Sequence, residues 1–229
     1  MIVYYAGMAG NVADLYTAVK HGCRHLMLSY YYKNRDKQMK RFRKLGLHIF
    51  LDSGAYSAWK KGVVIDLDEY IQYIKNNYIG KYIVLDVVGD PEKSYENLKY
   101  MESQGLQPLP VFHLGSDIKY LQQLVDEEYY CICLGGTVGS SREKRIEFFD
   151  ECFSKFSNTY FHGLGMTDPK LMLKYPWFSV DSTTWLIGRK MSKLQTLEGQ
   201  IPISKELSIA ERIALNVQFF RKLEKDAVL

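Results

Sequence analysis

The stretch YIVLDVVGDPEKSYENLKYMESQGLQPLPVFH, residues 82–113, contains one complete unit of the fold that the sequence predicts. Residues 82–87 form a short apolar run rich in β-branched side chains, which favours a strand buried on both faces. Asp90 precedes a proline, an arrangement typical of a helix N-cap followed by the first helical residue. The expected helix covers 91–104, a glycine follows it, and 108–113 is a second strand.

This alternation of short strand-like runs and longer amphipathic runs extends along the whole chain. The expected strands cover 2–7, 25–30, 48–54, 82–87, 108–113, 129–136, 160–165 and 177–182. The expected helices lie near 11–21, 36–45, 67–77, 91–104, 117–127, 141–156, 168–174 and 205–224. Eight such units predict a (β/α)₈ barrel, as a single compact α/β domain over residues 1–229. The alternative is a doubly wound open sheet, which usually has a G-x-G-x-x-G fingerprint that AGMAGN at 6–11 lacks.

Composition excludes several classes of protein. The chain has 229 residues, 47% of them apolar, and a formal net charge of +4. This apolar content is sufficient for one sizeable core, and the mild charge does not by itself identify a partner. The N-terminus MIVYYAG lacks the features of a signal peptide, and there is no apolar run of about 18 residues. The four cysteines have no disulfide or zinc spacing, so we expect a cytoplasmic protein without a metal or cofactor.

Three of the expected strands end in an aspartate: Asp52 in FLD, Asp86 in VLD and Asp181 in SVD. In a barrel the carboxyl ends of the strands meet at one mouth, where catalytic residues lie. Crowding three carboxylates there costs stability, because like charges repel each other and burial removes their hydration. The sequence therefore predicts an active site at this mouth, although a single such aspartate is more often a helix cap or a loop acceptor. Other strand ends contribute His113, Gly135, Gly136 and His162.

The three carboxylates are compatible with several chemistries. One aspartate could attack a glycosidic carbon while another moves protons, as in retaining glycoside chemistry. A magnesium site is the weaker option, because no further acid joins them at the strand ends.

A basic run, YYKNRDKQMKRFRK at 31–44, follows the second expected strand. It begins on the predicted catalytic face and continues into a helix. Phosphate-backbone contacts would use its cations, and a solvated helix face is the alternative. The candidate nucleic-acid contacts are Lys33, Arg35, Lys37 and Arg41.

Four segments, in this order, resemble motifs of the tRNA-guanine transglycosylases. LDSGAYS at 51–57 is similar to the family's DSGGFQ-type motif, and VLDVVGD at 84–90 to the strand that reads the guanine edge. CLGGTVG at 133–139 is similar to its Gly-Gly loop, and YFHGLGMTDPKLMLKYPWFSVDSTTW at 160–185 to the passage that ends in its nucleophilic aspartate. The resemblance implies a base exchange in nucleic acid through a covalent glycosyl-enzyme.

The resemblance assigns a role to each matching position. Asp181 would be the nucleophile and Asp52 the proton shuttle that activates an incoming 7-deazaguanine-type base. Asp86 and the amides of the Gly135–Gly136 loop would bind the base. The other implied substrate contacts are Ser53, which adds a polar contact, and Tyr56, which stacks on the base. Their strand-end positions make His113 and His162 further candidate contacts, and the alternative for His162 is that it satisfies neighbouring loop groups.

Departures from the family pattern indicate which nucleic acid is the substrate. The C-terminal zinc site of the transfer-RNA enzymes is missing, because no cysteine follows Asp181. His113 replaces the family's glutamine. The compact form is similar to phage and bacterial relatives that modify DNA, so DNA is favoured over transfer RNA as the partner, in a bacterial or host cytoplasm. A homodimer or a partner in a modification complex is a further expectation. The alternative functions are a nucleoside or base hydrolase and a non-catalytic nucleic-acid-binding subunit.

Overall fold

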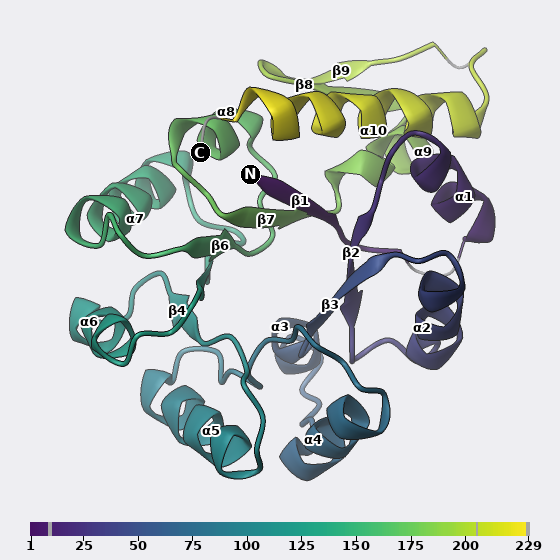
Figure 1. Cartoon of the computed structure of the whole chain (residues 1–229). Helices are drawn as coiled ribbons and strands as arrows, with labels where there is room; N and C mark the ends of the chain where they lie inside the picture. Colours follow the sequence, from purple (N-terminus) through teal and green to yellow (C-terminus); the bar gives the residue numbers. More distant parts are fainter. Residues whose placement is uncertain (9–10, 205, 228–229) are drawn as a thin grey trace.

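Seven parallel strands form the central sheet of the computed structural model, which describes residues 1–8, 11–204 and 206–227. Their order is β3-β2-β1-β7-β6-β5-β4, and the sheet curls so that the helices form an outer ring around it (Figure 1). The strands are β1 (Ile2–Tyr5), β2 (His25–Ser29), β3 (His48–Asp52), β4 (Val111–His113), β5 (Ile132–Gly135), β6 (Phe161–Gly163) and β7 (Ser179–Ser182).

An eighth segment, residues 82–84, joins the two ends of this sheet. It lies between β3 and β4 through two isolated parallel bridges, Leu51 with Tyr82 and Ile83 with Leu109. It is not a full strand, because the chain turns immediately afterwards and the Asp86 N–H donates to the Val84 carbonyl at 2.9 Å. The predicted (β/α)₈ barrel is therefore confirmed, with its fourth strand shorter than expected.

The helices follow the predicted positions to within a few residues. They are α1 (Val12–Lys20), α2 (Arg35–Lys44), α4 (Leu67–Asn76), α5 (Pro91–Ser103), α6 (Ile118–Asp126), α7 (Arg142–Lys155), α8 (Pro169–Lys174) and α10 (Ile209–Asp226). The expected N-cap is also confirmed at α5, where the Asp90 side chain accepts a hydrogen bond from the Lys93 N–H.

Several short elements were not expected from the sequence. Helix α3 (Ala55–Trp59) follows β3 directly and lies at the carboxyl end of the barrel. A 3₁₀ turn η1 (Thr184–Leu186) and helix α9 (Ile187–Met191) come after β7. They lead into an antiparallel hairpin of β8 (Lys193–Thr196) and β9 (Gly199–Pro202), which lies beside α10 in Figure 1.

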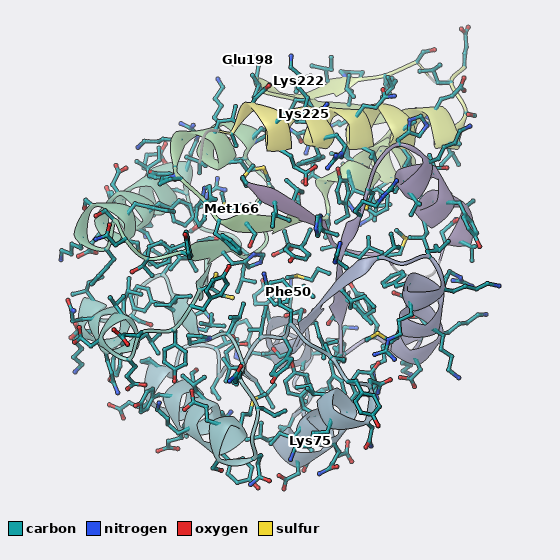
Figure 2. The ribbon with its side chains drawn as sticks, in the orientation of Figure 1. Phe50, Lys75, Met166, Glu198, Lys222 and Lys225 are labelled. Carbon is teal, nitrogen blue, oxygen red and sulfur yellow. The ribbon has the colours of Figure 1, made fainter. Side chains whose placement is uncertain are left out.

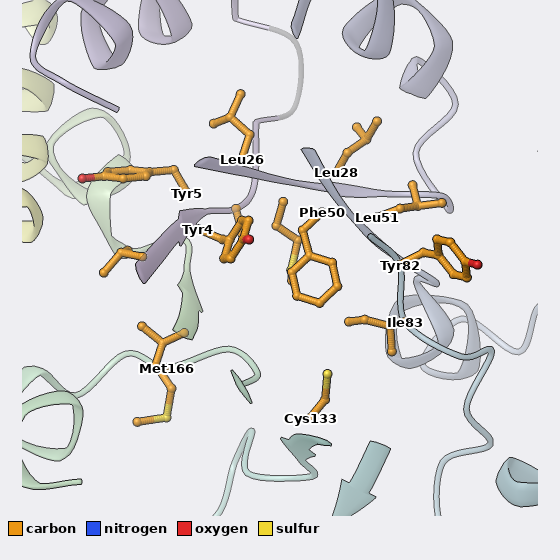
Figure 3. Close-up of a cluster of buried hydrophobic side chains, with 14 of the residues drawn as sticks. Tyr4, Tyr5, Leu26, Leu28, Phe50, Leu51, Tyr82, Ile83, Cys133 and Met166 are labelled. Carbon is orange, nitrogen blue, oxygen red and sulfur yellow. The ribbon is translucent and has the colours of Figure 1, made fainter. Parts of the chain in front are cut away.

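The core has two layers that follow from the alternation of side chains along each strand. Phe50 and Ile83 point into the barrel, whereas Leu26, Leu28 and Leu51 point outward to the helices (Figure 3). All five are at most 1% exposed. Both faces of the strands are therefore buried, as the apolar runs predict.

Charged side chains project from the outer surface. Lysines and acids such as Lys75, Lys222, Lys225 and Glu198 point away from the barrel, whereas Phe50 lies inside it (Figure 2). All four cysteines are buried and unpaired. Within the described residues, no helix combines the length and the apolar character that a bilayer crossing would need.

Candidate active site

A pocket of about 480 Å³ opens at the carboxyl ends of the barrel strands. It brings together most of the residues that the sequence predicts for the site, and these come from β3, β4, β5, β7, α3 and the segment after residue 84. They are Asp52, Tyr56, Asp86, His113, Asp181 and the Gly135–Gly136 pair. The strand ends therefore meet at one mouth, as the barrel topology requires.

Asp52, the last residue of β3, is half-buried beside two other acids. Burial raises the pKa of its carboxyl from an ordinary 3.8 to about 7, and the charges of Asp86 and Asp181 act in the same direction. The backbone amide of Gly54 and the Ser29 hydroxyl act in the opposite direction. A large fraction of Asp52 is therefore protonated near neutral pH, so this carboxyl can donate a proton there.

Gly54 determines the turn that follows Asp52. Its φ of +78° is in the left-handed region, and a Cβ placed on it would lie 2.5 Å from Tyr31 Cβ. Any other residue would both strain this backbone and collide with Tyr31. The turn starts α3, so it also places Tyr56 and Trp59 at the rim, where their rings lie 6.0 Å apart.

Asp86 is held by hydrogen bonds to both of its oxygens. The Ser53 hydroxyl donates to Oδ1 at 3.2 Å, and His113 Nε2 lies 3.0 Å from Oδ2. Both members of the Asp86–His113 pair are 11% exposed. Because an ionised carboxylate only accepts hydrogen bonds, His113 must have its proton on Nε2. The Asp86 carboxylate therefore orients the His113 ring at the pocket wall.

Asp181 is in a different environment from Asp52. It is 5% exposed, and the Gly165 N–H donates to its Oδ1 at 2.7 Å. The Met166 N–H donates to the Asp181 carbonyl at 2.8 Å, so the loop after β6 fixes both the backbone and the side chain. The pocket therefore contains one carboxyl whose pKa is raised by burial and another whose Oδ1 accepts a backbone hydrogen bond from the loop after β6.

Two predicted site residues, Ser53 and His162, do not line the pocket. Ser53 is fully buried and acts through Asp86. His162 is also fully buried and lies beneath Asp181, with its Nε2 3.6 Å from Asp181 Oδ1. It is a neighbour of the site rather than part of its surface.

The four predicted nucleic-acid contacts lie on or just before α2, on the outside of the barrel. The Arg35 guanidinium covers the Tyr30 ring at 4.3 Å and the Tyr73 ring at 5.0 Å, and it donates to the Tyr30 carbonyl at 3.1 Å. Arg41 is half-buried, whereas Lys33 and Lys37 are exposed. None of the four lines the pocket. A nucleic-acid partner and a homodimer both stay predictions.

The structure adds pocket residues that the sequence analysis did not assign. Ser29 lies opposite Asp52 in the β2–β3 register, and Thr183 lies two residues beyond Asp181 on the same face. The period-two rule for strands could have identified both. Trp59 depends on the unexpected α3.

The pocket differs from several familiar kinds of site. Among its described lining residues there is no lysine or arginine. In the part of the chain that the structure describes, no three His, Cys, Asp or Glu side chains group as metal ligands would. The polar groups of the described lining are carboxyls, one imidazole, hydroxyls and backbone amides.

Comparisons with known proteins place this barrel among solved structures. No family model and no curated protein matches the chain. A 4-hydroxy-2-oxoglutarate aldolase/2-deydro-3-deoxyphosphogluconate aldolase from TTHB1 is 10% identical, with a TM-score of 0.61 over 97% of this chain and 93% of that one. A tryptophan synthase α-subunit from Pyrococcus furiosus is 11% identical, with a TM-score of 0.59 over 96% and 97%. A structure described as native KDPGal is 10% identical, with a TM-score of 0.60 over 99% and 94%.

The predicted membership in the tRNA-guanine transglycosylase superfamily is therefore wrong, because the structures that the chain resembles are aldolase and tryptophan synthase α barrels. The predicted base exchange, a pentosyl transfer in DNA with a 7-deazaguanine base, is wrong for the same reason. The hydrolase and non-catalytic alternatives to it are not retained. The motif matches have a physical explanation. LDSG, LGG and HGLG lie at strand–loop junctions, where a barrel mouth itself favours aspartate and glycine. At about 10% identity the likeness shows the fold: the chain is a (β/α)₈ barrel of the architecture that these aldolases and synthase subunits share.

Proposed function

We propose that the chain is an enzyme that transfers protons at the barrel mouth, with Asp52 as the donor and Asp181 as the acceptor. The observation that supports this is the contrast between two carboxyls in one pocket. Burial raises the pKa of Asp52 to about 7, whereas the Gly165 N–H holds Asp181 as an acceptor. A pair of titratable groups in contrasting environments is the usual arrangement for an acid and a base.

The charge of the pocket favours a neutral or cationic substrate. Three carboxyl groups line it, and its described lining has no lysine or arginine to offset their charge. An anionic substrate would be repelled and would raise the cost of ionising Asp52 further. The volume of about 480 Å³ suits a small molecule, and Tyr56 and Trp59 offer an aromatic surface at the rim.

The reaction that we propose is an aldol-type cleavage of a β-hydroxy carbonyl compound. Asp181 removes the proton of the β-hydroxyl, the carbon–carbon bond breaks, and the electron pair passes to the α-carbon and the carbonyl group. Asp52 delivers its proton to the carbonyl oxygen, so the products are an aldehyde and an enol. The proton lost by Asp52 is balanced by the one gained by Asp181, and the total charge of the pocket stays constant.

A carboxyl mechanism fits this pocket better than a Schiff base does. One of the structural neighbours is an aldolase, which motivates the choice of an aldol-type reaction. A Schiff base would need a lysine amine, and the described lining has none. Lys81 is an interior lysine, but its ammonium packs against Tyr4, Phe50 and Phe178 and does not line the pocket.

The test is to incubate the protein in D₂O with neutral, cationic and anionic β-hydroxy carbonyl compounds, and to follow cleavage and α-carbon deuteration by NMR. We expect turnover of neutral or cationic compounds, and a fall of about 10²- to 10⁴-fold in Asp52→Asn and Asp181→Asn. Asp126→Asn, at an exposed position on α6, is the matched control and should retain full activity. Equal rates in all four proteins, faster turnover of the anionic compounds, or inactivation by borohydride in the presence of substrate would each contradict the proposal.

A further inference from the structure

His162 and Ser179 form a buried polar pair directly beneath the pocket. They are opposite partners in the β6–β7 register, and both are fully buried. His162 Nδ1 lies 2.8 Å from Ser179 Oγ. The ring is enclosed by Phe50, at 4.9 Å between ring centroids, and by Tyr4, at 6.0 Å. This packing leaves the imidazole little freedom to turn.

The other nitrogen of this ring faces the proposed proton acceptor. Asp181 lies two residues beyond Ser179 in β7, so both side chains point to the same face of the strand. His162 Nε2 is 3.6 Å from Asp181 Oδ1 and has no hydrogen-bond partner within the described part of the chain. A buried polar atom without a partner is costly, so the Asp181 carboxyl that Nε2 faces determines whether this nitrogen carries the proton.

We propose that Ser179 and His162 form a relay that positions Asp181. The Ser179 hydroxyl donates to Nδ1 of His162, and the Nε2–H of His162 faces Oδ1 of Asp181. The opposite tautomer would place a bare lone pair against a carboxylate oxygen, which is repulsive. This inference deepens the proposed function, because it rests on Asp181 being the acceptor.

The relay and the loop act on the same oxygen. The Gly165 N–H and the His162 Nε2–H both face Oδ1, and Oδ2 of Asp181 has no hydrogen bond within the residues that the structure describes. Oδ2 is therefore the oxygen available to a substrate. When Oδ2 takes up a proton, Oδ1 becomes a weaker acceptor. The distance of 3.6 Å between His162 Nε2 and Oδ1 should then increase, and no hydrogen bond has to be broken.

His162 does not itself become the base. Burial lowers its pKa, and the Lys81 ammonium acts in the same direction, while Asp181 opposes them. The Lys81 ammonium donates a hydrogen bond to the Tyr4 hydroxyl at 3.2 Å. The ring therefore stays neutral at neutral pH, and a proton from the substrate remains on Asp181. This makes His162 a positioning residue.

The experiment is long-range ¹H–¹⁵N NMR of ¹⁵N-histidine-labelled protein, with the His162 signals assigned by their loss in His162→Gln. We expect the tautomer with Nε2 protonated in the wild type. Asp181→Asn should shift the Nε2–H signal or populate the other tautomer, because an amide can both donate and accept. Asp86→Asn is the matched control: it removes another acid of the same pocket, one that contacts His113, and should leave the His162 signals unchanged.

Two results would overturn the relay: a wild-type His162 protonated on Nδ1, or His162 signals that respond no more to Asp181→Asn than to Asp86→Asn. The spectra require no turnover. If the wild-type protein cleaves none of the compounds in the substrate panel, the proposed reaction is refuted. The relay is still tested separately, by the NMR signals of His162.

Discussion

Replacing Asp52 with asparagine should stabilise the fold while it slows the reaction. The folded protein raises the pKa of this carboxyl from 3.8 to about 7, mainly because burial disfavours its charge. Between these values the folded state binds a proton that the unfolded chain has lost, so stability falls as the pH rises from about 4 to about 7. A difference of about three pKa units corresponds to about 4 kcal/mol, and relaxation of the pocket reduces the expected cost to about 2–4 kcal/mol.

An asparagine side chain at this position does not ionise, so the variant avoids the free-energy cost of burying a charged carboxylate. The free energy of unfolding of Asp52→Asn should therefore exceed that of the wild type by about 2–4 kcal/mol at about pH 8 and match it near pH 4. Urea denaturation followed by tryptophan fluorescence at both values measures the difference. Asp126→Asn should change stability little at either pH. If Asp52→Asn is less stable than the wild type at about pH 8, or the difference does not depend on pH, the assignment of a raised pKa to Asp52 is refuted.

Three further substitutions test the architecture around the site, each by urea denaturation. Asp86→Asn should lower the free energy of unfolding by about 1–3 kcal/mol, because an amide cannot accept from both Ser53 and His113; an unchanged midpoint would contradict this. Gly54→Ala should lower the free energy of unfolding by about 2 kcal/mol or more beyond the loss in Gly105→Ala. Both glycines have a φ of +78°, but an added Cβ meets Tyr31 only at Gly54. Equal losses in the two variants would mean that the contact with Tyr31 is unimportant. Asp14→Ala should cost about 1–3 kcal/mol and respond weakly to salt, because Asp14 is 3% exposed and accepts two hydrogen bonds from the partly exposed Arg189, at 2.5 and 2.6 Å. A strong salt dependence would show that this pair behaves as an exposed one.

The sequence was sufficient for the barrel because its signals are local and repeated. An apolar run of strand length can be recognised from adjacent residues alone, and so can a proline that follows an N-cap acid. Asp90, for example, caps α5 as predicted. The fourth strand is shorter than expected, because its end is set by the turn at Asp86 and not by hydrophobicity. The β8–β9 hairpin was missed, because its strands are polar and partly exposed and so lack a clear alternation.

The three aspartates at the mouth were predicted for a sound topological reason, since strand ends of a barrel converge. Their differences were not predictable, because they depend on atoms from other strands. Asp86 is held by Ser53 and His113, and Asp181 by the Gly165 amide. The family assignment failed because short aspartate and glycine motifs report the barrel rim rather than a particular reaction.

The central claim is that one carboxyl of this pocket remains protonated close to neutral pH. It is tested most directly by a ¹³C NMR titration of protein labelled at the aspartate carboxyl carbons, with the Asp52 signal identified by its absence in Asp52→Asn. We expect this signal to titrate with a midpoint at about 7. A midpoint near 3.8, the ordinary value for aspartate, would contradict it.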